Sequence, residues 1–259
     1  MSRIFISGSS TGLGLMAGQL LASQGHQIVL HARNAQRADD ARRALPKAAA
    51  VVVGDLDTIA AAKDVAAQVN VLGREFGRFD AVIHNAAVGY QEPQRTTSDG
   101  LPHVFAINTL AAYILTALIE RPARLVYLSS GMHHHADANL DDIRWERRRW
   151  NGSTAYAESK LHDAMLACAL ARRWPDVLSN ALEPGWVPTK MGGRGAPDDL
   201  DQGHLTQAWL AAADDPEARV SGQYFYHLKP LKFNPQAADP ELQDALVEIC
   251  ANISGVALP

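Results

Sequence analysis

The sequence has few cysteines and no long apolar run. Its two cysteines, Cys168 and Cys250, have neither a paired spacing nor the spacing of metal ligands, so we expect no disulfide framework. No stretch approaches the roughly 18 apolar residues of a membrane-spanning helix. The apolar stretch after Met1 is too short for the core of a signal peptide. We therefore expect a reduced, cytoplasmic protein without a membrane partner.

Basic charge is also scarce. The formal net charge of the 259 residues is −4, and the short basic cluster at Arg147, Arg148 and Arg149 lies among acidic residues and tryptophans. Duplex DNA requires a larger basic surface, so we interpret this cluster as a solvated loop face and expect no nucleic-acid partner. The sequence also has no internal repeat and no low-complexity linker.

The chain does contain an alternation of short apolar runs and helical stretches, which is typical of a parallel sheet wrapped by helices. We expect strands at residues 3–7, 27–31, 49–53, 80–84, 124–128, 177–183 and 223–227. We expect helices at residues 13–24, 35–45, 59–72, 100–119, 154–174 and 205–213. The pattern predicts an α/β fold, a single Rossmann domain over residues 1–259 with a doubly wound parallel sheet of about seven strands.

Two long irregular segments interrupt this alternation. Residues 131–153 follow the fifth expected strand, and residues 190–203 follow the sixth. Long loops are usually functional or disordered, and ligands bind at the carboxyl ends of strands in open α/β sheets. We expect a substrate loop at 131–153 and a lid at 190–203, followed by a helix, a strand and a tail.

A glycine-rich turn joins the first strand to the first helix. Gly8, Gly12 and Gly14 allow a tight turn and a close approach of the backbone to a pyrophosphate, and the helix N-terminus presents free N–H groups to that anion. The spacing differs from the common G-x-G-x-x-G fingerprint, and a glycine turn without a nucleotide is the competing interpretation.

The end of the second strand indicates which cofactor fits. NAD sites usually place an acidic residue there for the ribose 2′-hydroxyl, and this chain has none. Arg33 suits a 2′-phosphate instead, so we expect NADP, with NAD possible. An exposed loop arginine is the competing interpretation. Asp55, after the third strand, lies where an adenine amino group could donate to it.

Four polar residues form the expected catalytic set. Tyr156 and Lys160 are four residues apart and share one helix face, where a lysine favours the phenolate and lowers the pKa of the phenol. Such a tyrosine can exchange a proton with a substrate oxygen near neutral pH. Ser130, at the end of the fifth strand, offers a hydroxyl to the same oxygen, and Asn108 is a polar residue in an apolar stretch.

In this order along the chain, these motifs resemble the short-chain dehydrogenase/reductase family over nearly the whole length. The resemblance rests on the glycine turn, Asn85-Ala86-Ala87, the four residues above and the segment from Pro184 to Thr189. It implies an oxidoreductase that moves hydride between a nicotinamide and a carbonyl or alcohol carbon.

The resemblance implies a role for each matching residue. Tyr156 is the general acid/base, Lys160 binds the nicotinamide ribose, Ser130 holds the substrate oxygen, Asn108 supports a relay water, and residues 184–189 hold the carboxamide end of the nicotinamide. The residues expected to bind the cofactor are Gly8, Ser10, Gly12, Leu13, Gly14, Arg33, Asn34, Asp55, Leu56, Asn85, Ala86, Ala87, Tyr156, Lys160, Pro184, Gly185, Val187 and Thr189.

The long interval between Ser130 and Tyr156 resembles the retinol-dehydrogenase-like branch, which mostly prefers NADP. The interval contains His133-His134-His135 and Trp145. Adjacent histidines point in alternating directions and no acidic cluster of metal spacing accompanies them, so we expect no metal site. Tryptophans and methionines in the loop and lid favour an apolar or aromatic substrate, namely Met132, Trp145, Trp150, Trp186 and Met191.

Several alternatives stay open. A non-catalytic nucleotide-binding or regulatory protein could share this fold, although it would be expected to lose Tyr156, Lys160 or Ser130. A nucleotide-sugar epimerase is disfavoured because only about 75 residues follow the sixth strand. A homo-oligomer is possible. Ala87 stands where the family usually has glycine, and Glu183, before Pro184, either contacts substrate or, as we favour, caps a strand.

Overall fold

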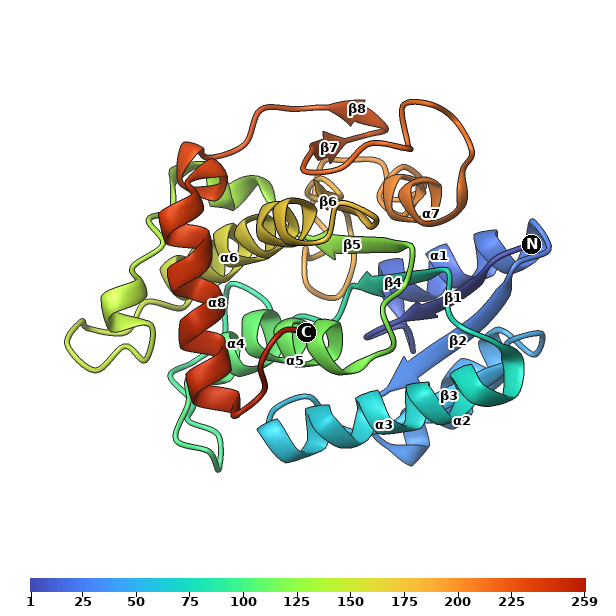
Figure 1. Cartoon of the computed structure of the whole chain (residues 1–259), viewed down its shortest axis with the longest axis horizontal. Helices are drawn as coiled ribbons and strands as arrows, with labels where there is room; N and C mark the ends of the chain where they lie inside the picture. Colours follow the sequence, from blue (N-terminus) through green and yellow to red (C-terminus); the bar gives the residue numbers. More distant parts are fainter.

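Eight strands form one sheet in a computed structural model that describes all 259 residues (Figure 1). The strand order is β3-β2-β1-β4-β5-β6-β7-β8, and every neighbouring pair is parallel except β7 and β8. The strands are β1 (Arg3–Ile6), β2 (Gln27–Ala32), β3 (Ala50–Val53), β4 (Ala81–His84), β5 (Arg124–Leu128), β6 (Leu178–Glu183), β7 (Tyr224–Tyr226) and β8 (Lys229–Pro230). This topology confirms the predicted Rossmann fold class.

Helices cover both faces of the sheet. The helical segments are α1 (Gly12–Ser23), α2 (Ala35–Ala44), α3 (Ile59–Phe76), α4 (His103–Phe105), η1 (Ala106–Leu110), α5 (Ala111–Leu118), η2 (Gly131–His135), η3 (Leu140–Asp142), α6 (Gly152–Arg173), α7 (Leu205–Ala212), η4 (Pro235–Ala238) and α8 (Pro240–Ser254). None of these helices has the combination of length and hydropathy needed to cross a membrane.

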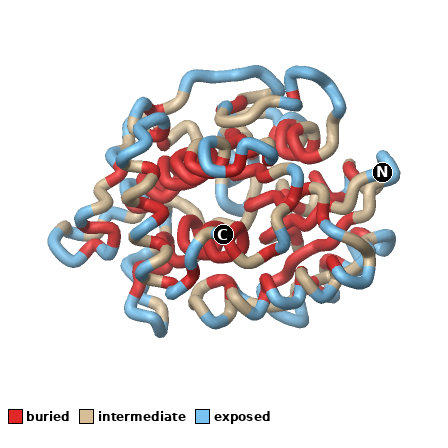
Figure 2. The backbone as a smooth tube through the Cα atoms, in the orientation of Figure 1, coloured by how far each residue is buried: buried red, intermediate tan, exposed pale blue.

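Alternation of side chains along the strands divides the core in two. On β1, Ile4 and Ile6 pack with residues of α1, α2 and α7, whereas Phe5 packs with residues of α3, α5, α6 and α8. Successive strand side chains point to opposite faces, so a strand covered on both faces is apolar throughout. Figure 2 shows the resulting buried residues along the central strands and along α5 and α6.

The helix expected at residues 100–119 is divided into three segments. A π-helical turn, η1, separates α4 from α5, and Asn108 lies within that turn. A π turn inserts one extra residue into the helix and commonly occurs at functional sites. The helical segment therefore begins later than predicted, and its pitch changes at Asn108, the polar residue expected to belong to the catalytic set.

Three elements near the C-terminus were not predicted, namely β8, the short 3-10 helix η4 and α8. Helix α8 begins at the Asp239 cap with Pro240 in its first turn and ends at Gly255, whose φ is +64°. These are ordinary boundary signals, and we interpreted the segment as a tail. Strand β8 follows a two-residue hairpin turn at His227 and Leu228, both with positive φ, where Asn-Gly is the usual sequence.

Candidate functional site

The glycine turn follows β1, next to β4, where the strand order reverses. Gly8 and Gly12 have φ values of +63° and +61°, in the left-handed region that favours glycine. A Cβ on Gly8 would lie 2.6 Å from the Cα of Ala86, so the two turns are in direct backbone contact. Thr11, the N-cap of α1, makes no side-chain cap, so the first N–H groups of α1 have no cap partner.

The turn after β4 is bound to the glycine turn by hydrogen bonds. The side-chain amide of Asn85 donates to the carbonyls of Ser7 (3.0 Å) and Gly8 (2.9 Å), and the Ser7 hydroxyl accepts from the backbone N–H of Asn85 and Ala86. Asn85 therefore holds the two turns together. Ala87 has no positive φ, so the alanine in place of the usual glycine causes no backbone strain.

His31, on β2, is a site residue that the sequence analysis missed. Its Nδ1 accepts from the backbone N–H of Gly8 (2.9 Å) and its Nε2 bonds the carbonyl of Gly54 (2.9 Å). This pairing requires the neutral ring with the proton on Nε2. Burial lowers the pKa of His31, which favours the same neutral form. A histidine inside an apolar strand, two residues before Arg33, was the available signal.

The residues expected around the adenosine end of the cofactor differ in whether their side chains already have a partner within the protein. Arg33 is exposed and follows β2 directly. The side chain of Asn34 accepts from the N–H of Arg37 and caps α2. The Asp55 carboxylate accepts from the N–H of Leu56 (2.7 Å), and Leu56 is buried. Of these residues, Arg33 is therefore the one whose side chain has no assigned partner within the protein.

Tyr156 and Lys160 lie on α6, which packs against the carboxyl end of β5. The Ser129 hydroxyl donates to the carbonyl of Lys160 (2.7 Å), and the Lys160 ammonium donates to the carbonyl of Leu128 (2.7 Å). The ammonium lies 5.7 Å from the centre of the Tyr156 ring. Burial raises the pKa of Tyr156, whereas the nearby Lys160 ammonium and Ser130 hydroxyl lower it. The structure thus brings Tyr156, Lys160 and Ser130 together.

Lys160 also has an acidic partner that the sequence analysis missed. Its Nζ lies 2.8 Å from the Asp163 carboxylate, and the side chains of the two residues are only 3% and 4% exposed. Burial raises the pKa of Asp163 to about 6 in spite of the nearby ammonium. Burial also acts to lower the pKa of Lys160, but Asp163 and Tyr156 more than offset it, so that pKa is raised. Spacing of three on one helix was the available signal.

Asn108 connects the loop after β4 to α6. Its Oδ1 accepts from the N–H of Val88 (2.8 Å), and its Nδ2 donates to the Val88 carbonyl (3.1 Å) and to the Ser159 hydroxyl (3.0 Å). Ser159 in turn donates to the carbonyl of Tyr156 (2.7 Å). The side chain of Asn108 therefore makes three hydrogen bonds with protein partners, and it fixes the helix turn that carries Tyr156.

The segment after β6 crosses to the glycine turn. Gly185 has a φ of +86°, and the N–H of Trp186 donates to Asp198 (2.6 Å) in the expected lid. A Cβ on Gly203, at the end of that lid, would lie 3.0 Å from Leu13 and 3.1 Å from Val187. Residues 184–203 are thus in contact with the beginning of α1.

Glu183, the last residue of β6, lies over the turn that follows Ser130. A Cβ on Gly131 would collide with its carboxylate, and His134 Nε2 is 3.9 Å away. Burial raises the pKa of Glu183 to about 7, with a further contribution from Asp198. The buried hydroxyl of Tyr224, on the adjacent strand, has no hydrogen-bond partner. Glu183 is therefore a half-buried acid beside the expected catalytic serine.

The histidine run lies in η2. His133 is buried, its Nδ1 bonds the carbonyl of Ser130 (2.8 Å), and its Nε2 accepts from the N–H of Asn234 (3.3 Å). No group of three or more His, Cys, Asp or Glu side chains is arranged to hold a metal ion. His133 connects the end of β5 to the segment before α8.

The interpretation of the arginine cluster as a solvated face was wrong for Arg148. Its guanidinium bonds Glu158 on α6 (2.5 Å) and Asp142 (2.9 Å), and it stacks 4.0 Å from the centre of the Trp145 ring. The Asp142 and Glu158 side chains are almost fully buried. Arg148 thus links the loop at 131–153 to α6, the helix that carries Tyr156.

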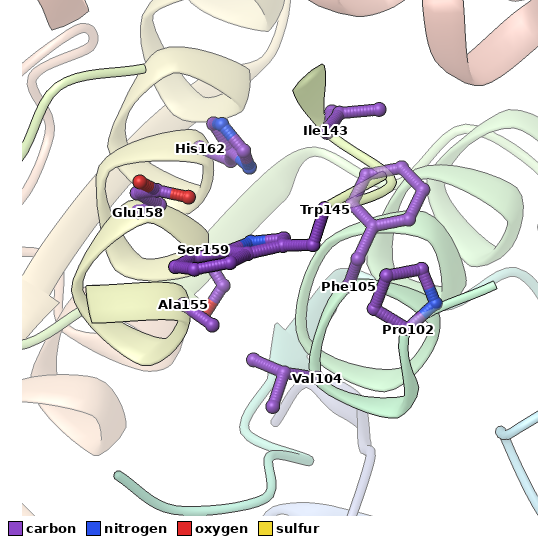
Figure 3. Close-up of a pocket in the computed structure, with 9 residues that line it drawn as sticks. All are labelled: Pro102, Val104, Phe105, Ile143, Trp145, Ala155, Glu158, Ser159 and His162. Carbon is purple, nitrogen blue, oxygen red and sulfur yellow. The ribbon is translucent and has the colours of Figure 1, made fainter. Parts of the chain in front are cut away.

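Trp145 occupies the space between that loop and two helices (Figure 3). Its ring points between α6, which contributes Ser159 and His162, and the segment that carries Val104 and Phe105. The remaining cavity is about 10 Å³, which is too small for a substrate. Trp145 is therefore a packing residue, contrary to our expectation that it lines the substrate site.

The chain is similar to known proteins over nearly its whole length. Residues 8–218 match the enoyl-(acyl carrier protein) reductase family. The uncharacterised oxidoreductase AN7799 of Emericella nidulans is 44% identical, covering 100% of this chain and 99% of its own. The short-chain dehydrogenase chry4 of Gibberella zeae is 39% identical over 100% and 99%. Human retinol dehydrogenase 14 is 29% identical over 98% and 86%.

Solved structures show the same fold. A protein from Mycobacterium paratuberculosis has a TM-score of 0.83 at 25% identity, covering 100% of this chain and 95% of that one. A metagenomic blue fluorescent protein in complex with NADPH has a TM-score of 0.70 at 20% identity, covering 86% and 95%. The chain belongs to the short-chain dehydrogenase/reductase family of oxidoreductases. Its similarity to human retinol dehydrogenases 14 and 13, at 29% and 28% identity, supports the retinol-dehydrogenase-like branch.

Proposed function

We propose that this protein is an NADP(H)-dependent carbonyl reductase or alcohol dehydrogenase with Tyr156 as its general acid/base. The observation that carries the proposal is the grouping of Tyr156, Lys160 and Ser130 at the carboxyl end of β5. Ligands bind at this edge of open α/β sheets, and the glycine turn opens at the same edge. We propose that the whole chain acts as one nucleotide-binding unit.

The residues of the glycine turn fit a dinucleotide. Gly8 leaves no room for a side chain, and α1 begins without a side-chain cap, so its N-terminus offers N–H groups to a pyrophosphate. Asn85 fixes the adjacent turn, and residues 184–189 would hold the nicotinamide end. A similar structure binds NADPH. The exposed Arg33, with no acidic residue beside it, supports a 2′-phosphate and hence NADP.

When bound, the reduced nicotinamide would supply a hydride to the carbonyl carbon. The protein's part is to manage the charge on the carbonyl oxygen. Ser130 donates a hydrogen bond as negative charge develops there. Tyr156 gives its proton to that oxygen, which completes the alcohol, and water restores the proton. Lys160 holds positive charge close to the phenol, and Asn108 fixes its helix turn through Ser159.

The substrate would lie between the loop at 131–153 and the lid at 190–203. Trp186 is 55% exposed and Met191 is 38% exposed, and Met191 lies against Gly89 across the site. These side chains are available to an apolar or aromatic carbonyl compound, unlike Trp145. The position of Met191 supports a lid that contacts the loop after β4.

The test is turnover of NADPH with a panel of aromatic and aliphatic carbonyl compounds. Tyr156→Phe should leave folding and NADPH binding nearly unchanged and lower turnover by about 10²-fold or more. Lys160→Ala should lower both turnover and NADPH affinity. Tyr113→Phe is the matched control, since it also removes a buried hydroxyl, bonded to Val256 (2.8 Å), and it should retain turnover. Near-parent turnover in Tyr156→Phe, with chemistry rate-limiting, would refute the mechanism and favour a non-catalytic role.

A further inference from the structure

Asp163 is the one charged group that contacts Lys160. The two side chains are three residues apart on α6, 2.8 Å apart in space, and nearly inaccessible to solvent. At so low an exposure, water screens the pair weakly, so each charge acts strongly on its neighbours. The ammonium makes one further protein contact, with the carbonyl of Leu128 on β5. Asp163 and the Leu128 carbonyl therefore hold the ammonium in place, and of the two only Asp163 offsets its charge.

The groups that surround Asp163 come from three elements. Lys160 and Tyr156 share α6 with it, Tyr127 lies on β5, and Tyr224 lies on β7. The Asp163 carboxylate disfavours ionisation of each of these tyrosines, whereas Lys160 favours ionisation of Tyr156. Asp163 thus partly cancels the effect of the Lys160 charge on the ionisation of Tyr156.

We propose that Asp163 is a positioning residue that holds Lys160 and offsets its charge, so that Tyr156 keeps its proton up to a higher pH than it would beside an unpaired lysine. This inference rests on the proposed function and concerns its direction. Reduction forms a C–H bond with the hydride of the nicotinamide and an O–H bond with the Tyr156 proton. That step requires the phenol, whereas oxidation of an alcohol requires the phenolate. Asp163 therefore keeps Tyr156 in the phenol form, which reduction requires, up to a higher pH.

The principal experiment is the pH profile of kcat/KM for carbonyl reduction in Asp163→Asn. Asparagine keeps the shape and can still accept from Lys160, but it removes the negative charge. Tyr156 should then ionise more readily, and the pH at which kcat/KM falls to half should decrease by about one unit. Asp163→Glu should retain much of the parent profile. Asp244→Asn, the matched control, removes an exposed carboxylate on α8 that pairs with Arg172 and Arg173, and it should leave the profile unchanged.

A second measurement is independent of turnover. Tyrosine labelled with 13C at Cζ reports phenol ionisation by NMR, and Tyr156→Phe identifies the Tyr156 signal. In the cofactor-free parent this signal should titrate above the ordinary phenol range, as its raised pKa requires. It should titrate about one unit lower in Asp163→Asn.

The two measurements separate the possible failures. An unchanged Tyr156 titration in Asp163→Asn would overturn the role of Asp163 and leave the proposed reductase intact. If the Tyr156 titration shifts in Asp163→Asn but the parent reduces no carbonyl compound, the proposed function is overturned instead. The charge effect of Asp163 on Tyr156 is then retained.

Discussion

Replacement of Arg148 by alanine should strongly destabilise the protein. The guanidinium bonds two carboxylates, Asp142 in the loop and Glu158 on the catalytic helix, and it stacks on Trp145. Both carboxylate side chains are more than nine-tenths buried. Without Arg148, Glu158 would lose its cationic partner and Asp142 the closer of its two, while both carboxylates remain largely out of water. The loop would also lose one of its links to α6.

The magnitude follows from that burial. Removal of one partner of a buried ion pair typically costs about 3–5 kcal/mol, because a charge is left uncompensated. Loss of the stacking on Trp145 adds roughly 0.5–1 kcal/mol. Arg147→Ala is a matched control on the adjacent residue. The Arg147 and Asp141 side chains are 63% and 79% exposed, and such pairs contribute about 0–1 kcal/mol. The guanidinium of Arg147 lies 3.9 Å from Asp142, whereas that of Arg148 lies 2.9 Å away.

The assay is urea unfolding of the parent and of both variants at several pH values. The cost of Arg148→Ala should decrease as the pH falls toward 4, because protonation removes the uncompensated charges on Asp142 and Glu158. Turnover should also fall, since the loop contacts the helix that carries Tyr156. A free energy of unfolding in Arg148→Ala that equals that of Arg147→Ala would refute the reasoning.

Three further predictions concern the remaining parts of the site. Burial raises the pKa of Glu183 from 4.5 to about 7, so the parent should lose stability as the pH rises through this window. Glu183→Gln should remove up to about 3 kcal/mol of that loss. An equal pH dependence of urea unfolding in the parent and the variant would contradict this prediction. Arg33→Ala should weaken NADPH binding by about 1.5–3 kcal/mol and NADH binding far less, as measured by calorimetry, and equal affinity of the parent for both cofactors argues against the 2′-phosphate contact. Amide hydrogen exchange in the lid at 190–203 should slow when cofactor and a substrate analogue bind, and unchanged exchange would count against closure.

The fold was largely predictable because its signals are local. Strand β5 was predicted at its observed bounds, and most other strands and helices within one or two residues. Short apolar runs, proline stops and the glycine turn are properties of neighbouring residues, which a sequence shows directly. The exceptions depend on less usual chemistry, such as the His227-Leu228 hairpin turn and the π turn at Asn108.

The sequence by itself determined the Rossmann fold class and the family, and it indicated Tyr156, Lys160 and Ser130 as the proposed catalytic residues, since fixed spacing on a helix and at strand ends carries these signals. Only the tertiary structure decided which charges are paired. Whether Arg148 is solvated or buried depends on where the loop lies against α6, and the bond of His31 to Gly8 joins residues 23 positions apart. The effect of Asp163 likewise depends on burial beneath the strand ends. Burial and charge pairing arise from contacts between distant segments, and these contacts exist only in the folded chain.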